Sequence, residues 1–511
     1  MNRKQNLFPG SRYWDLSQKA DSIHRCADVS TAALLYFMIV FTPWAFGTTQ
    51  AWSIWTMNLC GYVLGCLLVV KWICRWQSEP VIAEAEQTSH LGGWLTRCLA
   101  VLTVVIVGYC LCAAVNARAK YDLERLAFEY YENYLPWLPH SYDRDRSFAL
   151  FWNYLGLALA FWAIRDWLVN DRRSHPEAAQ YLGRTREPIQ VWAPPQRLTR
   201  LLWVLVINGA LLAMEGLIQR ADGGAKLLWI METRINREAT SQFGPYAYRS
   251  NAAQYFNLLW PAVLGFWCWR EQAARRERGD AGTHRILIPL IVLIAVCPII
   301  SLSRAGAIVT LINVIAASAV VMLSVRRLRR RMAAGIGIAI AVIVCATLFF
   351  NGSELLKRFA TSSKDFYEGR ELTYQTAKGM LRDYPVFGTG PGTFEHVFQL
   401  YRKNSDEYWP AQLHNDWLET AITFGWLGFG LIGAAFLLIL AAWFIPGQIR
   451  APWAFIAMLW ISLAGCLIHA RVDFPFQIYS TLFFVILLCA ILFSFSKSHR
   501  CTDAEPALIL A

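Results

Sequence analysis

The stretch LIPLIVLIAVCPIISLSRAGAIVTLINVIAASAVVMLS (287–324) decides the fold of this chain. It contains two long apolar runs joined by a few polar residues around Arg304. An apolar run of about 20 residues is long enough to cross the hydrocarbon core of a bilayer as a helix. The stretch therefore predicts two membrane-spanning helices with a very short turn between them.

The same pattern recurs along the whole chain. Of its 511 residues, 56% are hydrophobic and only 16% are charged, and the mean hydropathy is +0.33. Soluble domains carry roughly 25% charged residues, so a soluble protein is excluded. We predict an all-α, polytopic membrane protein with about twelve transmembrane helices. The expected spans lie near residues 30–47, 51–73, 96–115, 147–169, 199–218, 251–269, 285–302, 304–324, 332–350, 417–445, 452–470 and 476–495.

The basic residues give the orientation. REQAARRERGDAGTHR (270–285) and VRRLRRR (325–331) fall on the same predicted side as the basic segment 1–29. Short cytoplasmic loops are rich in Lys and Arg, so both termini, including the tail 497–511, are expected in the cytoplasm. The net charge of +12 is thus interpreted as a topology signal, and no nucleic-acid partner is expected.

Three polar segments face outward in this orientation, near 116–146, 219–250 and 351–416. The last is the largest. We predict it as an extracytoplasmic loop between helices one to nine (30–350) and helices ten to twelve (417–496). The 13 cysteines lie mostly in apolar runs, without the spacing of a metal site, and neither a metal nor a cofactor is expected.

Arginines stand at the outer ends of several predicted helices. Arg304 follows the first apolar run quoted above, Arg249 follows a Gly-Pro turn, and Arg370 begins a short amphipathic segment of the large loop. A guanidinium at the membrane surface can hold a phosphate through two parallel hydrogen bonds. The alternative for Arg304 is a snorkelling side chain that simply ends a helical hairpin.

The large loop also contains FGTGPGTF (387–394), with Gly390 and Gly392 at its centre. A glycine-rich loop can cradle phosphate with backbone N–H groups. This one lacks the GK[ST] ending, and no strand precedes it. A tight, closely packed turn is therefore the favoured interpretation.

The loop ends in LHNDWLE (413–419). Asp416 and Glu419 are spaced as an acidic form of the capping box that starts a helix. That interpretation does not explain His414, whose neutral imidazole can accept a proton at working pH. A lone histidine at an interface is more often structural. Another short outer turn, HARVDFPFQ (469–477), contains Asp473, and Asn251 is expected to cap the span at 251–269.

Together these segments resemble the O-antigen ligase and polymerase superfamily of bacterial envelope glycan assembly, over about residues 200–480. The matching positions are Gly244, Pro245, Tyr246, Arg249 and Asn251; Ser303, Arg304 and Gly306; Arg370; Gly388 to Phe394; His414, Asn415, Leu418 and Glu419; and Asp473, Phe474 and Pro475. The first five spans agree with the family only in number and topology.

The resemblance implies a metal-independent glycosyltransferase of the bacterial inner membrane with a helical, GT-C-like fold. The implied donor is a glycan on undecaprenyl diphosphate, and the acceptor is lipid A core or another surface glycan. His414 is the implied base, with Arg304, Arg370 and Arg249 on the diphosphate. Supporting roles fall to Asn415, Asn251, Asp473, Gly390 and Gly392.

Two other functions remain open. An exopolysaccharide or O-antigen polymerase would extend a lipid-linked chain, and its motifs fit equally well, although the R-x10-G pattern of some polymerases is absent. A transporter or flippase would carry polar residues or helix breaks at mid-span in corresponding halves. Here the polar features gather on one predicted side.

Overall fold

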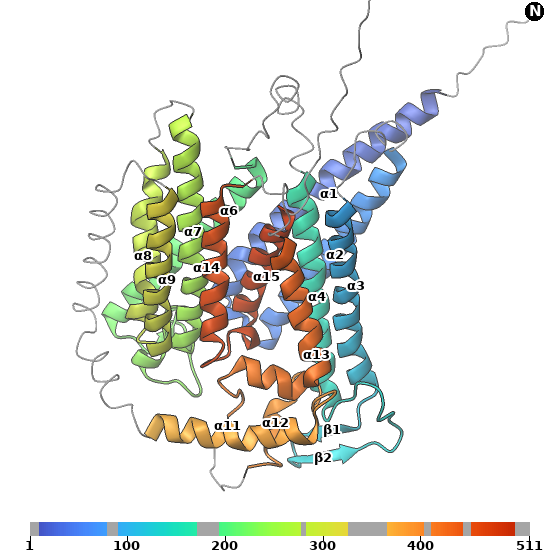
Figure 1. The fold of residues 1–511 in the computed structure, drawn as a ribbon, viewed down its shortest axis with the longest axis vertical. Coiled ribbons are helices and arrows are strands. Elements are labelled where there is room, and N and C mark those ends of the chain that lie inside the picture. Colours follow the sequence, from blue (N-terminus) through green and yellow to red (C-terminus); the bar gives the residue numbers. More distant parts are fainter. Residues whose placement is uncertain are drawn as a thin grey trace, which may run out of the picture.

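The computed structural model describes residues 10–78, 90–170, 194–276, 283–324, 365–402, 410–442 and 451–495. In these ranges the chain is a bundle of helices that run mostly side by side (Figure 1). The helices are α1 (Gly10–Trp44), α2 (Ala51–Ser78), α3 (His90–Val115), α4 (Arg144–Asn170), α6 (Gln196–Asp222), α7 (Arg249–Arg276), α8 (Leu287–Ile300), α9 (Arg304–Ser324), α11 (Asp365–Asp383), α12 (Phe394–Phe398), α13 (Asp416–Ala441), α14 (Trp453–His469) and α15 (Tyr479–Ser494).

These helices agree with an all-α membrane protein. Seven of them, α1, α2, α3, α4, α6, α9 and α13, contain stretches long and apolar enough to cross a bilayer. Shorter apolar helices cover His284–Ile300, Trp453–His469 and Tyr479–Ser494. Helix α7, at the span expected near 251–269, is not among these apolar helices. The span expected at 332–350 lies outside the described residues, as does the first part of the large loop, so the count of twelve stays a prediction.

The parts of the predicted outer segments that can be followed in Figure 1 gather at one end of the bundle. There α11 lies across the ends of the long helices, with α12 and an antiparallel pair of strands, β1 (Ala119–Asp122) and β2 (Ala127–Tyr130), beside it. A second, shorter pair, β3 (Lys226–Leu227) and β4 (Met231–Glu232), follows α6. Helix α1 begins at the opposite end. The arrangement therefore agrees with the prediction that the three polar segments lie on one side of the membrane and the N-terminal segment on the other.

Helix α7 holds the start of α9 in place. A Cβ atom on Gly306 would lie 2.5 Å from the Cβ of Ala253, so only glycine permits this approach of the two helices. The side chain of Asn257 then donates to the Gly306 carbonyl at 3.0 Å and accepts from the Thr310 hydroxyl at 2.9 Å. Polar bonds of this kind fix helix pairs in apolar surroundings. Arg304, at the first turn of α9, is therefore fixed relative to α7.

Helix α13 is broken, although the sequence predicts a continuous apolar span at 417–445. Gly425 has φ 62° and ψ 179°, which no helix accommodates. The backbone N–H groups just after the break donate to the carbonyls of Pro385 and Val386 at 2.8 and 3.2 Å. Carbonyls just before it accept from the N–H groups of Thr389 and Gly390 at 2.9 and 3.0 Å. A break in a membrane helix requires such partners, because lipid supplies none.

The glycine-rich segment 387–394 packs against the break at Gly425. Gly388, Gly390 and Gly392 all have positive φ, at 73°, 110° and 76°. A Cβ on Gly388 would lie 2.5 Å from the backbone nitrogen of Gly425, and one on Gly390 would lie 2.6 Å from the Cα of Ser141. The interpretation as a tight, closely packed turn is confirmed.

We predict that Gly425→Ala destabilises the protein by at least about 2 kcal/mol, because it combines a disfavoured φ with a collision. The new Cβ would lie 2.2 Å from the Val386 carbonyl oxygen. Gly430→Ala in the same helix is the matched control, since its Cβ meets nothing within 4 Å. Thermal unfolding in detergent measures both variants. Equal melting temperatures for the two would contradict the proposed role of the break.

Candidate functional site

A pocket of about 1120 Å³ lies where α9, α11 and the first part of α13 meet the turns before α7 and after α14. Arg249, Arg304 and Arg370 all line it, although they come from three distant parts of the sequence. Asn415 and Asp473 line it as well. The structure thus brings the three predicted arginines and two of the predicted supporting residues to one cavity.

His414 does not itself line this pocket, but it contacts the lining residues Arg370 and Asp473 at its edge and has a strained backbone conformation. Its φ is 56°, a region that residues other than glycine seldom occupy and that clusters at functional sites. The Tyr374 hydroxyl of α11 donates to the His414 carbonyl at 2.9 Å. The imidazole stands edge-on to the ring of Phe474 at 4.7 Å and remains 29% exposed. The ring is therefore held in place but accessible.

Asp473 orients the histidine. Its Oδ1 lies 3.1 Å from His414 Nδ1 and also accepts from the N–H of Phe474 at 3.1 Å. A carboxylate only accepts hydrogen bonds, so we assign the proton of the neutral ring to Nδ1, which leaves the lone pair on Nε2. Arg370 Nη2 lies 3.4 Å from the same Nδ1. A guanidinium only donates hydrogen bonds, and Nδ1 carries a proton in this tautomer. Arg370 therefore acts on the ring through its positive charge rather than through a hydrogen bond to Nδ1.

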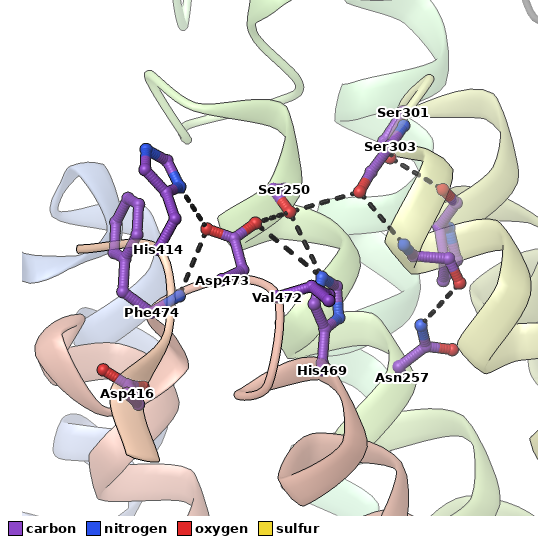
Figure 2. A network of polar contacts seen from close by, with 12 residues as sticks. Ser250, Asn257, Ser301, Ser303, His414, Asp416, His469, Val472, Asp473 and Phe474 are labelled. Carbon is purple, nitrogen blue, oxygen red and sulfur yellow. Dashed lines mark hydrogen bonds and ion pairs between the residues drawn. The ribbon is translucent and has the colours of Figure 1, made fainter. Parts of the chain in front are cut away.

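Asp473 is buried, and its charge depends on several partners (Figure 2). Burial alone raises the pKa of this carboxyl, but the hydrogen bond from His414, the nearby His469 and the hydroxyl of Ser250 outweigh that effect. Its pKa lies below the ordinary value of 3.8. The carboxylate is therefore anionic at neutral pH and favours the orientation of His414 described above.

Ser250 links this carboxylate to two further helices. Its Oγ donates to Asp473 Oδ2, lies 3.2 Å from Nε2 of His469 at the end of α14, and lies 3.1 Å from Oγ of Ser303 just before α9 (Figure 2). From the sequence, Ser250 is expected, like Asn251, only as a candidate cap of the span that follows, and nothing in a single sequence connects residues so far apart. These contacts fix the turns that carry Arg249, Arg304 and Asp473 relative to one another.

The three arginines are held by different means. Arg370 Nη1 donates to the Val472 carbonyl at 2.9 Å, beside Asp473. Arg249 Nη1 donates to the Thr240 carbonyl at 3.0 Å. Arg249 and Arg304 are the first residues of α7 and α9, where the helix dipoles add positive potential. The pocket is thus suited to a multiply charged anion.

The expected capping box was wrong in its position. The N-cap of α13 is Asn415, whose side chain accepts from the N–H three residues later at 3.2 Å. Glu419 reaches back to the N–H of Leu413 at 2.7 Å. Asp416 instead accepts from the N–H of Phe476 at 2.7 Å and so holds the turn after α14. Asn and Asp are equally good N-cap residues. Asn415 is the N-cap here because the Asp416 carboxylate accepts from the N–H of Phe476.

Three other predicted residues lie elsewhere. Asn251 is buried inside α7, so it does not cap that helix, which begins at Arg249. Asn251, Gly390 and Gly392 do not line the pocket that holds the arginines. Over the described ranges, no group of three or more His, Cys, Asp or Glu side chains could hold a metal ion. The absence of a metal requirement stays a prediction.

We predict that the stability contributed by Asp473 is lost in acid. A carboxyl with a lowered pKa in the folded state stabilises the fold fully above its unfolded value of 3.8, and less as the pH falls through the folded pKa. The difference in melting temperature between the wild type and Asp473→Asn should shrink between about pH 5 and about pH 2. Asp145→Asn, at an exposed carboxylate, is the control. A difference that stays constant over this interval would contradict the assignment.

Comparison with known proteins adds a family. Residues 289–433 match the sequence model of the family described as O-antigen ligase. No curated protein matches the chain. The matched region contains Arg304, Arg370 and His414, whereas Arg249 and Asp473 lie outside it. The expected resemblance to the O-antigen ligase and polymerase superfamily is confirmed for residues 289–433.

Proposed function

We propose that this protein transfers a glycan from an undecaprenyl-diphosphate donor to an acceptor hydroxyl on the outer face of the bacterial cytoplasmic membrane. The acceptor is lipid A core or another surface glycan. The family supports a glycosyl-transferring enzyme in general. The observation that carries the specific proposal is one pocket lined by Arg249, Arg304 and Arg370, with His414 at its edge.

In this proposal His414 is the general base. Nε2 takes the proton of the acceptor hydroxyl while the oxygen attacks the anomeric carbon of the donor. The bond from that carbon to the diphosphate oxygen breaks, and the lipid diphosphate leaves with the electron pair. Asp473 stabilises the imidazolium that forms, because its carboxylate lies 3.1 Å from Nδ1. A positioned base of this kind contributes roughly 10²–10⁴-fold to a rate.

The arginines act on the leaving group. The glycosyl diphosphate is already activated, and the charge on its leaving oxygen grows in the transition state. Fixed cations that face this charge lower the barrier because they need no reorganisation during the reaction. Arg370 and Arg304 are the main candidates, and Arg249 is the third. No further chemistry is required of the protein than positioning, anion stabilisation and one base.

The rest of the pocket suits a lipid-linked donor. Ile308 and Val309 of α9 line it from one side, and Trp426 and Phe429 of α13 line it from the other. Ile308 and Trp426 are more than half exposed, as side chains that face lipid are. A polyprenyl chain can therefore lie between α9 and α13 while its diphosphate reaches the arginines.

We predict that His414→Ala lowers glycan transfer by at least about 100-fold in folded, membrane-inserted protein, because the variant removes the base. The assay uses purified protein and a lipid-diphosphate glycan donor. His414→Asn is the second variant, since asparagine also tolerates the left-handed backbone of this position. Full transfer by purified His414→Ala would overturn the proposal.

We predict that Arg370→Ala and Arg304→Ala each lower kcat by about 10²–10³-fold, the effect of removing one donor to a developing charge. Arg382→Ala is the matched control, because Arg382 is exposed on the same helix as Arg370 and does not line the pocket. Rates are measured at saturating donor. Equal activity of Arg370→Ala and Arg382→Ala would remove Arg370 from the site.

The product separates the remaining alternatives. A ligase joins the glycan to lipid A core, a polymerase yields a longer lipid-linked chain, and a transporter moves the glycan without changing any linkage. Mass spectrometry of the products from proteoliposomes that contain donor and both acceptors distinguishes these outcomes. We expect a new linkage that depends on His414.

A further inference from the structure

A second pocket, of about 930 Å³, lies on the side of the bundle formed by α2, α3 and α4. Helices α2 and α3 both pack along α4, which forms the floor of the pocket between them. Its polar end is formed by the last turns of α2 and α4 and the first turns of α3. In Figure 1 these turns lie at the end of the bundle opposite α11, which is one of the helices that line the arginine pocket.

Three arginines, Arg75, Arg97 and Arg165, line the polar end. Arg165 is only 7% exposed, and one nitrogen, Nη2, donates to Thr96 Oγ1 at 3.1 Å. Its Nε has no hydrogen-bond partner among the described residues. A buried donor without an acceptor is costly, so native proteins seldom leave one unsatisfied. The geometry points to an acceptor that is supplied by a ligand.

The carboxylate at this end is already engaged. Asp166 lies 2.7 Å from Arg75 Nη2 and 3.4 Å from Nζ of Lys71, a lysine that is fully buried. Asp28 lies 3.7 Å from the same Nζ, so two carboxylates pair with Arg75 and Lys71. The Arg165 guanidinium lies over the rings of Phe493 and Trp162, at 4.9 and 5.6 Å from their centroids, and its positive charge and that of Arg97 line the pocket beside these pairs. Arg97 is exposed at the mouth of the pocket.

The rest of the pocket is apolar and elongated. Val104, Val107 and Leu111 of α3 face Leu155 and Leu159 of α4 along it. From Arg97 to Leu111 a helix rises by about 21 Å, which exceeds the half-thickness of about 15 Å of a hydrocarbon core. Gly108 also lines the groove, and a Cβ placed on it would meet nothing within 4 Å. The groove has the length and open space for an acyl chain.

Tryptophans indicate how deep in the membrane the polar end of the pocket lies. Trp72, Trp76 and Trp162 line the pocket beside the arginines, and Trp76 is 82% exposed. Tryptophan is enriched where a membrane protein crosses the boundary between hydrocarbon and headgroups. The arginines are thus at the level of lipid phosphates, and the apolar groove extends from them into the bilayer.

We propose that this pocket binds one anionic phospholipid of the membrane, with its phosphate on Arg165 and Arg97 and one acyl chain in the groove between α3 and α4. Basic pockets between transmembrane helices recognise acidic headgroups in this way. The site is separate from the proposed transfer reaction and does not depend on it. Its role is to hold the ends of α2, α3 and α4 together at the end of the bundle opposite α11.

Native mass spectrometry of the purified full-length protein tests the proposal. Delipidated protein is titrated with phosphatidylglycerol or with phosphatidylcholine of the same acyl chains. We expect one phosphatidylglycerol to be retained with an affinity at least about tenfold higher, because only the anionic headgroup pairs with the arginines. Arg97→Gln and Arg165→Gln should each remove most of this preference. Arg144→Gln, at the other end of α4, is the control of equal charge change.

A second variant tests the acyl chain. Gly108→Leu fills the open part of the groove, so it should weaken phosphatidylglycerol binding by about tenfold while the lipid-free melting temperature stays unchanged. Equal retention of both lipids, or an unchanged preference in Arg97→Gln, would overturn the proposal. Displacement of the lipid by millimolar inorganic phosphate would also overturn it, since the site would then bind a free anion. Arg97 is exposed, so this test does not depend on whether Arg165→Gln folds.

Discussion

The end of the helix bundle that holds the arginine pocket depends on one buried carboxylate. Asp473 contacts His414 before α13 and Ser250 at the start of α7, and its backbone accepts from the N–H of Asp416. A buried charge is tolerated only when its oxygens are hydrogen-bonded, so each of these partners must stay in place. The requirement links three helices that the bilayer alone would leave free to slide past one another.

Much of the fold could be predicted from the sequence because a bilayer imposes a simple pattern. The apolar runs near 51–73, 147–169 and 304–324 coincide with α2, α4 and α9. The break in α13 could not be predicted, since the run around Gly425 is continuously apolar. Its cause is a tertiary contact with the segment 385–390, and no pattern within α13 records that contact.

The residues of the candidate site also fall into two groups, those that the sequence could indicate and those that it could not. Arg249 and Arg304 could be singled out because a cation at the start of an apolar run is expensive enough to be noticed. His414 and Asp473 lie in short polar turns, and only the resemblance to a family indicated a function for them. Ser250 could not be recognised, because a serine near a helix start has a local explanation. Only the packing of α7 against α9 and α14 shows its contacts with Ser303, His469 and Asp473.

The break in α13 has a consequence for biogenesis. The hydrogen bonds at Gly425 are made with residues 385–390, which emerge from the ribosome earlier and belong to the segment predicted outside the membrane. The exposed backbone groups of the broken helix are costly in lipid until that segment has been translocated. In the predicted topology, helix α13 can therefore reach its final shape only after the loop has crossed the membrane, and the arginine pocket would be assembled after insertion rather than during it.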